Sequence, residues 1–459
     1  MYAKPVSGAP GPWSRNVARG VPPDLYPPAV SEPLLDPPPP THDALPNRRL
    51  RSNRAFAALW TAATVSVFGS MVSRIALPFV AIETLRAGPL EIALLRSLEL
   101  VAALLVGFVA GAWVDRLRRR PVMIWADLGR AVLLGSIPVA AIGGWLSLPQ
   151  VLLVAMLAEV LTTFFDVADR AYLPSIVERA DLVRANGVLS ATMSAVEFVA
   201  FGVAGFLVRL LTAPIAVAID AVSFVVSALL LGAIRRPEPP PPPPAEREPI
   251  VAEIRDGLSL VVRDPVLRGL AWGTMGLGAM WGVFGTIWLL FSTGELGLDA
   301  GVIGVIAALG GFGSLLGALL AERAVGRYGL GRLVVVSLVF AAIGNLLIPL
   351  APAGAPLLAI LFLVGQQLVG DTAVTMFDVT EVSMRQARVA DRSLGRVNAT
   401  VRVLMVLAQL VGTAAGALVA ETAGLRAAGF LGPVFALLGA AALYRSPVRR
   451  VTRADDAPA

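Results

Sequence analysis

The sequence has 459 residues, of which 56% are hydrophobic and 15% are charged, and its mean hydropathy is +0.74. Soluble domains of average composition have about 25% charged residues, so this composition indicates a protein that crosses a membrane many times. The absence of cysteine excludes disulfides and thiolate metal sites, and the single histidine, His42, lies in a polar segment. We therefore predict no metal site and no cofactor. The net charge of +6 does not indicate nucleic-acid binding, because the arginines lie in short loops between apolar runs.

Residues 1–52 are rich in proline and lack the apolar core of a signal peptide, so we expect a disordered cytoplasmic tail. A misassigned start codon is the alternative explanation for this segment.

Twelve apolar stretches follow, and each has the roughly 20 residues that a membrane-spanning helix needs. They lie near 56–82, 91–114, 121–144, 149–168, 187–211, 213–234, 267–292, 299–321, 332–350, 356–379, 398–420 and 425–444. Arginines concentrate in the alternate loops that are internal if the N-terminus is internal, whereas the outer loops keep only Arg86, Arg209 and Arg426. Positive charge marks the cytoplasmic side. The pattern predicts a multi-pass protein of the cell membrane with both termini in the cytoplasm.

A polar segment at 236–266 divides the twelve stretches into two sets of six. Its six consecutive prolines, Pro239 to Pro244, predict a stiff polyproline spacer of about 19 Å. The apolar residues between 250 and 262 share one helical face, which is typical of an amphipathic helix at the membrane surface. We predict an N-terminal six-helix bundle over 53–235, this linker, a C-terminal six-helix bundle over 267–446 and a tail over 447–459.

Short sequences recur between the two sets. The Phe-Asp-Val of 165–167 returns at 377–379, and the Arg-x-Asn of 184–186 returns at 396–398, in both cases 212 positions later. A pair of glycines four residues apart also recurs, at 107 and 111 and again at 313 and 317. Two halves of equal topology predict parallel repeats, an arrangement on which one large class of transporters is built.

Charged residues inside the apolar stretches are costly to bury in lipid and mark function. With no histidine there, a transported proton has to bind a carboxylate, and the first candidates are Glu159 and Glu197, which both lie near the middle of the membrane. Alternatively, both are permanently paired with Arg130, Arg74 or Arg402. The predicted proton or substrate cavity includes these two glutamates and, in addition, Arg74, Asp220, Asp371, Arg402, Gln367, Trp281 and Trp288. The two tryptophans suit a flat or cationic substrate, or else they face lipid.

The segment GAWVDRLRRR, which begins at Gly111, resembles motif A of the major facilitator superfamily. Further segments between 54 and 450, such as AYLPSIVERADLVRANGVLSATMSA and DRSLGRVNATVRVL, resemble one branch of it, the bacterial exporters called drug:proton antiporter family three or transmembrane secretion effectors. The resemblance implies an all-α fold of twelve transmembrane helices in two parallel six-helix repeats. It also implies a monomer.

The resemblance assigns motif A to a gate on the inner side. Its residues here are Gly111, Asp115, Arg116, Arg119 and Arg120. Asp115 is expected to meet the N-terminal end of the eleventh helix, a favourable place for an anion. The arginines are partners for carboxylates or lipid phosphates.

The repeated Asp166 and Asp378 are predicted to be inner-gate carboxylates, because each lies at an inner helix end within reach of loop arginines. Asp127 and Asp220 are interpreted as structural, because the third and sixth helices are peripheral in this superfamily.

The sequence departs from that branch at three positions. Ala200-Phe201 stands where related exporters carry Gly-Pro, Phe108 replaces a second proline, and Ala321-Glu322 replaces the aspartate in the second copy of motif A.

We predict a secondary transporter, not an enzyme, that exports a small amphipathic compound (a drug, natural product or siderophore) by alternating access in exchange for protons. Its expected partners are this substrate, protons and membrane lipids. No ATP-binding domain is predicted, because no Gly-Lys-Ser/Thr follows the glycine-rich segments. The alternatives are a lysolipid flippase and a transporter-like scaffold or sensor that transports nothing.

Overall fold

The computed structural model describes residues 50, 53–114, 116–178, 181–236, 238 and 250–451, with backbone alone at 108, 111, 112, 197, 250–254 and 391. The predicted N-terminal tail (apart from Leu50), the proline run at 239–244 and the last eight residues lie outside this description.

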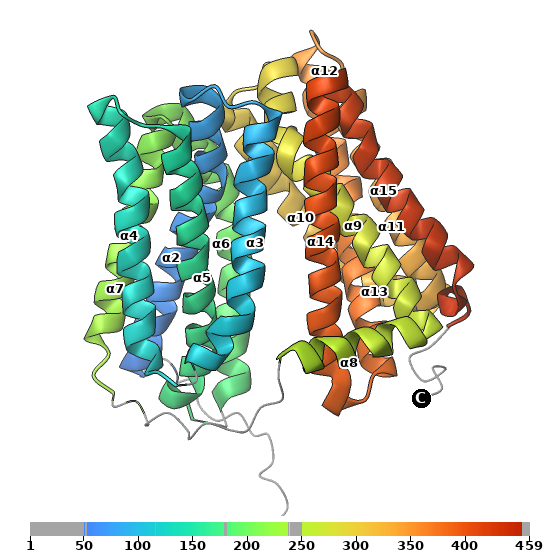
Figure 1. Ribbon diagram of the computed structural model, residues 1–459, viewed down its shortest axis with the longest axis horizontal. Helices are drawn as coiled ribbons and strands as arrows, with labels where there is room; N and C mark the ends of the chain where they lie inside the picture. Colours follow the sequence, from blue (N-terminus) through green and yellow to red (C-terminus); the bar gives the residue numbers. More distant parts are fainter. Residues whose placement is uncertain are drawn as a thin grey trace, which may run out of the picture. The chain divides into compact units, whose positions relative to one another are not determined.

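All regular structure in the described residues is helical, which confirms the all-α prediction (Figure 1). The N-terminal helix set, α2–α7, comprises α2 (Arg54–Phe79) with its π-helical continuation η2 (Val80–Thr84), α3 (Pro89–Val114), α4 (Arg119–Gly143), α5 (Leu148–Ile176), α6 (Leu182–Leu211) and α7 (Ala213–Ala233). After it comes α8 (Ile250–Arg263). The C-terminal helix set, α9–α15, comprises α9 (Pro265–Leu290) with η4 (Phe291–Glu295), α10 (Ala300–Tyr328), α11 (Leu330–Leu350), α12 (Pro356–Gln366) with η5 (Gln367–Asp371) and α13 (Thr372–Arg388), α14 (Asp391–Ala423) and α15 (Leu425–Arg445), followed by η6 (Pro447–Arg450).

Eleven helical spans in the described residues have the length and apolar composition needed to cross a membrane. They are α2 with η2, α4, α5, α6, α7, α9 with η4, α10, α11, α12 with η5 and α13, α14 and α15. The protein is therefore a multi-pass membrane protein.

The internal repeat is visible in the helix boundaries. A shift of 211 residues carries the start of α2 at Arg54 to the start of α9 at Pro265, and it carries η2 at Val80 to η4 at Phe291. The same shift carries Asn53 to Asp264. Asn53 Oδ1 accepts from the amides of residues 55 and 56 at 3.1 Å each, and Asp264 Oδ1 accepts from those of residues 266 and 267 at 2.7 and 3.2 Å. An N-cap side chain of this kind satisfies amides that have no partner within the helix. Both halves thus begin with the same signal.

Glycines allow the closest helix contacts. Lipid supplies no hydrophobic driving force between helices, so close packing has to hold them together. A Cβ at Gly282 on α9 would lie 2.7 Å from the backbone nitrogen of Thr413 on α14, and one at Gly412 would lie 2.8 Å from Cα of Ala279. These two helices therefore touch through their backbones.

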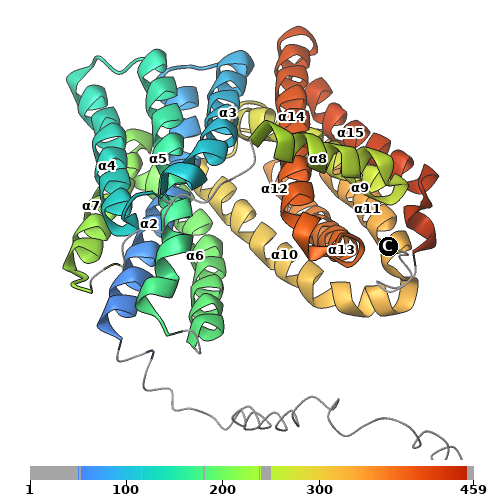
Figure 2. The ribbon, with the colours of Figure 1, turned by 60° about the horizontal axis from the view of Figure 1, so that its bottom comes forward.

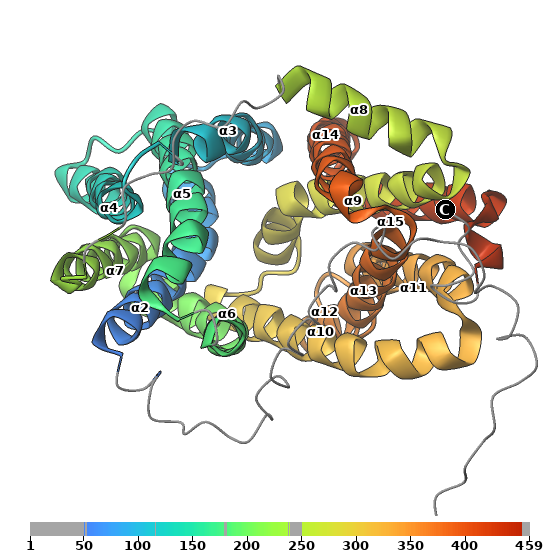
Figure 3. The same ribbon diagram turned by 90° about the horizontal axis from the view of Figure 1, so that it is seen from below.

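A second glycine pair joins the two helix sets. A Cβ at Gly205 on α6 would lie 2.7 Å from Cα of Gly304 on α10, and the converse distance is 2.8 Å. Figures 2 and 3 show α6 beside α10. Arg209 and Asp299 form an exposed ion pair, with 3.5 Å between the guanidinium nitrogen and the carboxylate oxygen, near the same contact.

Helix α8 is fastened to the C-terminal helix set. Arg396 on α14 donates to Asp256 Oδ2 at 3.1 Å, and a Cβ at Gly257 would lie 2.6 Å from the carbonyl oxygen of Arg396. Figure 3 shows α8 running beside α14. At the junction of α8 and α9, Arg388 pairs with Asp264 at 2.5 Å between nitrogen and oxygen.

Candidate functional site

A cavity of about 730 Å³ lies between the two helix sets. Its walls come from α2, α3 and α6 on one side and from α9–α13 on the other. This volume falls in the range of small-molecule sites.

Aromatic side chains form much of the wall. They are Phe198 and Phe201 on α6, with Trp281, Phe284 and Trp288 on α9. The tryptophans recur after seven residues, which places them on one face of α9. Such a wall offers broad apolar contact and ring faces that attract cations.

The charged groups of the cavity are divided between the two helix sets. Arg74 and Arg96 line it from α2 and α3, and Asp371 and Asp378 line it from η5 and α13. Glu99 accepts from Arg96 at 3.0 Å, so this arginine already has an acidic partner. Charges beside apolar walls interact more strongly than they do in bulk water.

The π-helical segment η5 positions Asp371. Gln367 Nε2 donates to the carbonyl oxygens of Ile306 and Ala307 on α10, at 3.2 and 3.4 Å. Thr372 Oγ1 donates to the carbonyl oxygen of Gly313 at 2.8 Å. A π-helical turn inside a helix often marks a functional site, because the extra residue redirects a side chain.

The predicted cavity residues separate into three groups. Five of them line the cavity together with the inner-gate carboxylate Asp378; they are Arg74, Trp281, Trp288, Gln367 and Asp371. The lining does not include Glu159 on α5, Asp166 or Arg402. The side chain of Glu197 on α6 lies outside the description. Asp220 does not line the cavity, and its side chain is buried within the N-terminal helix set.

Motif A is described only in part. Asp115 lies outside the described residues and Gly111 is described by its backbone alone, so the predicted contact with α14 stays a prediction. Arg116 is exposed. Arg119 lies 3.7 Å from Glu238, and Arg120 donates to the carbonyl oxygens of Leu231, at 2.8 Å, and of Gly232. Arg120 thus ties the start of α4 to the end of α7, and Arg119 ties it to the segment that follows α7.

Sequence reasoning missed Glu238, whose side chain is 5% exposed. Its two carboxylate oxygens accept from the backbone amides of Arg119 and Arg120, at 2.7 and 3.2 Å. The first amides of a helix have no partner within the helix, and an anion there is stabilised by the helix dipole. No local pattern signals a cap that lies 119 residues away in the chain.

Replacing Glu238 with alanine is expected to lower the free energy of unfolding by about 1–2 kcal/mol, because α4 loses its N-terminal acceptor. Glu238→Gln keeps an acceptor and loses the ion pair with Arg119, so its effect should stay below about 1 kcal/mol. Thermal unfolding of the purified protein in detergent measures both changes. Equal losses in the two variants would contradict the capping role.

The fold and the cavity between repeated halves define a membrane transporter. A family model described as "Major Facilitator Superfamily" matches residues 59–293, about half of the chain, and the chain belongs to this superfamily.

Two curated relatives match part of the chain. The "Uncharacterized MFS-type transporter YkuC" of Bacillus subtilis (strain 168) is 23% identical over 242 residues, which are 51% of this chain and 56% of that protein. The "Multidrug efflux pump Tap" of Mycolicibacterium fortuitum is 29% identical over 223 residues, 47% of this chain and 53% of that protein. The chain spans about half the length of the curated relatives it matches.

Solved structures share the fold over most of the chain. The nucleoside transporter NupG superposes with a TM-score of 0.69 at 15% identity, over 85% of this chain and 98% of that one. A bacterial homologue of the iron transporter ferroportin, in an inward-facing state, gives a TM-score of 0.67 at 18% identity, over 85% and 98% of the two chains. At these identities the likeness shows the fold alone.

Proposed function

We propose that this transporter exports a small amphipathic compound across the bacterial cell membrane by alternating access, in exchange for protons. The observation that carries the proposal is the cavity itself, which combines an aromatic wall with a few charged groups drawn from both helix sets. Such a lining suits a molecule with a flat apolar body and a polar or cationic end.

Two further observations support export. The partial similarity to a multidrug efflux pump favours a drug-like substrate and outward movement. The segments that resemble transmembrane secretion effectors favour the same branch of the superfamily, a monomer, and termini in the cytoplasm. Proton coupling has carboxyl groups available within the spans, among them Glu159 and Asp371.

The test uses inverted membrane vesicles acidified inside, with a pH-reporting dye. A panel of cationic drugs, macrolides and siderophores is added in turn. We expect at least one compound to release protons from vesicles that contain the wild-type protein and not from vesicles that lack it. A panel without any response would contradict drug:proton antiport, and labelled lysolipid would then test the flippase alternative. Failure with both would favour the scaffold.

Trp288→Ala is expected to raise the KM for a responding aromatic cation about two- to tenfold, because one aromatic contact contributes about 0.5–1.5 kcal/mol. Trp272→Ala is the matched control: Trp272 lies on the same helix, is 53% exposed and does not line the cavity. Initial rates of substrate-evoked proton release give both KM values. Equal values in the two variants would place the substrate elsewhere.

A further inference from the structure

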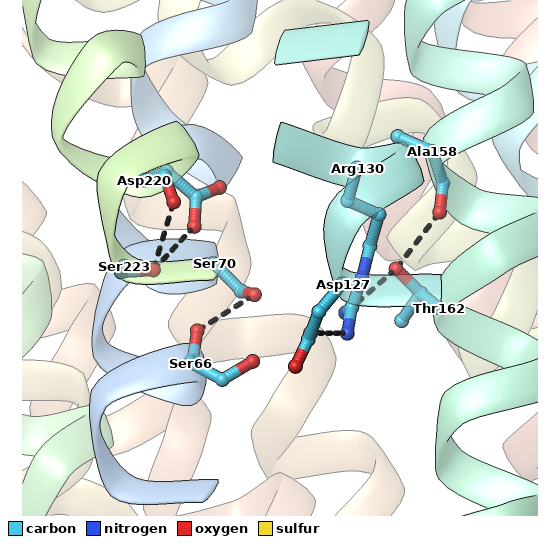
Figure 4. Close-up of polar contacts among 8 residues, drawn as sticks. All are labelled: Ser66, Ser70, Asp127, Arg130, Ala158, Thr162, Asp220 and Ser223. Carbon is cyan, nitrogen blue, oxygen red and sulfur yellow. Dashed lines mark hydrogen bonds and ion pairs between the residues drawn. The ribbon is translucent and has the colours of Figure 1, made fainter. Parts of the chain in front are cut away.

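A buried cluster of three charged side chains lies between α4 and α7, inside the N-terminal helix set. Asp127, Arg130 and Asp220 are 0%, 2% and 1% exposed, and none of them lines the transport cavity. Arg130 donates to Asp127 Oδ1 at 2.5 Å, and Asp220 Oδ1 accepts from Ser223 at 3.2 Å. Figure 4 shows the two carboxylates on different helices, with the guanidinium of Arg130 directed at Asp127 and Thr162.

Two rings screen the guanidinium of Arg130. Its central carbon lies 4.0 Å from the ring centroid of Phe224 on α7 and 4.5 Å from that of Phe165 on α5. Rings at this range attract the cation and exclude water. An arginine stays charged at any physiological pH, so the cluster always holds one positive charge.

The charges of the cluster do not balance if both carboxyl groups are ionised. Two carboxylates and one guanidinium leave one net negative charge out of contact with water, and an uncompensated buried charge is strongly unfavourable. The charged groups that face the cluster from the neighbouring helix α5 add to the imbalance. Asp166 acts on Arg130, Asp169 acts on Asp127, and Glu159 lies within range of Arg130. All three are acidic, and Arg170 on the same helix offsets the charges of Asp166 and Asp169 in part.

Several polar atoms around the carboxyl groups lack a partner among the described residues. Asp127 Oδ2 and Ser227 Oγ have no hydrogen bond of good geometry, although the two side chains face each other. Ser73 Oγ, which faces Asp220 from α2, is also without one. A serine hydroxyl can donate to an ionised carboxylate or accept from a protonated one, so these serines can serve the cluster in either protonation state.

We propose that Asp127 and Asp220 together bind one proton. The single positive charge of Arg130 balances one carboxylate, so only the other carboxyl group has to be protonated. Binding converts one carboxylate and a hydronium ion into a carboxylic acid and water, with no electron transfer. The inference rests on the proposed antiport and names the carboxyl groups that carry the proton. Asp166 on α5 is within electrostatic range of Arg130, of the cavity residue Arg74 and of Arg402 on α14, which makes it the candidate link between the cluster and the cavity.

Infrared difference spectroscopy of the purified, reconstituted protein tests the site without any substrate. We expect a protonated-carboxyl band that disappears as the pH is raised. Replacing either aspartate with asparagine (Asp127→Asn or Asp220→Asn) should lower the amplitude of this band by one carboxyl group. One carboxylate and one guanidinium then remain, and their charges balance without a proton. Asp264→Asn, which keeps the N-cap of α9, should leave the band unchanged. An unchanged band in both cluster variants would overturn the proposal.

Ser227→Ala provides a test that keeps all three charges, in case a cluster variant fails to fold. It should shift the position of the band without removing it, because Ser227 faces Asp127, and a band that does not move would count against the site. The vesicle assay separates the two proposals. If the wild-type protein moves no protons in the vesicles but shows the protonated-carboxyl band, the proposed antiport is contradicted and the proton-binding site is not. Proton release that persists in Asp220→Asn contradicts the assignment of the carrier to this cluster.

Discussion

Replacing Arg130 with leucine is expected to lower the free energy of unfolding by about 3–5 kcal/mol, the cost of leaving a buried partner charge uncompensated. Asp127 loses its ion pair at 2.5 Å, and Phe165 and Phe224 lose the cation that lies against their rings. Unfolding of the purified protein in detergent, followed by circular dichroism during heating or denaturant titration, measures the loss.

The control for this prediction is Arg209→Leu. Arg209 is 59% exposed and pairs with Asp299 at 3.5 Å, so its removal should cost no more than about 1 kcal/mol. Similar losses in the two variants would mean that the cluster around Arg130 contributes little to stability.

Gly304→Leu is expected to abolish most transport while the protein still folds. A side chain at 304 cannot fit while α6 and α10 touch, because its Cβ would lie 2.8 Å from Cα of Gly205. Overpacking of this kind costs about 1–3 kcal/mol, which shifts an equilibrium between two conformations about 5–150-fold. The favoured conformation is the one in which the helix sets part at this contact.

Cysteine labelling reports that shift, since the chain has no cysteine of its own. A single cysteine is introduced into the cavity by Phe201→Cys. A membrane-impermeant reagent added on the side of the α6–α10 contact should react with it faster when Gly304→Leu is also present than when residue 304 is glycine. Gly202→Ala is the control, because its Cβ would meet Ala308 at an ordinary 3.6 Å. Labelling at the wild-type rate in the leucine variant would contradict a closing role for this contact.

The sequence predicted the helices and the repeat well, and the faces of the helices poorly. Long apolar runs bounded by arginines are sufficient to place spans, and the recurring Phe-Asp-Val reports the repeat. Periodicity cannot separate inside from outside here, because lipid is as apolar as a protein interior. Helix α4 illustrates this: it exposes Val132 and Ile142, at 74% and 82%, and buries Asp127 and Arg130.

The lining of the cavity could be predicted in part, where a residue type is unusual for its surroundings. Charges and tryptophans in apolar runs led to Arg74, Asp371, Trp281 and Trp288, all of which line the cavity. The same reasoning also led to Asp220, which does not line the cavity, because a charged residue in an apolar run signals a special environment and not its location. Contacts between distant segments, such as Glu238 with the start of α4, depend on packing that no local pattern encodes.

The placement of charge around the cavity limits how a bound molecule can be oriented. Arginines face it from α2 and α3, and carboxyl groups face it from η5 and α13, so the empty space has an electrical polarity that runs from one repeat to the other. A molecule with a dipole has its lowest energy when its positive end lies toward the carboxyl groups and its negative end toward the arginines, so that the dipole is aligned with this field. Each end of the molecule then contacts the same repeat every time the molecule binds. Two isomers whose dipoles point in opposite directions are expected to bind in opposite orientations.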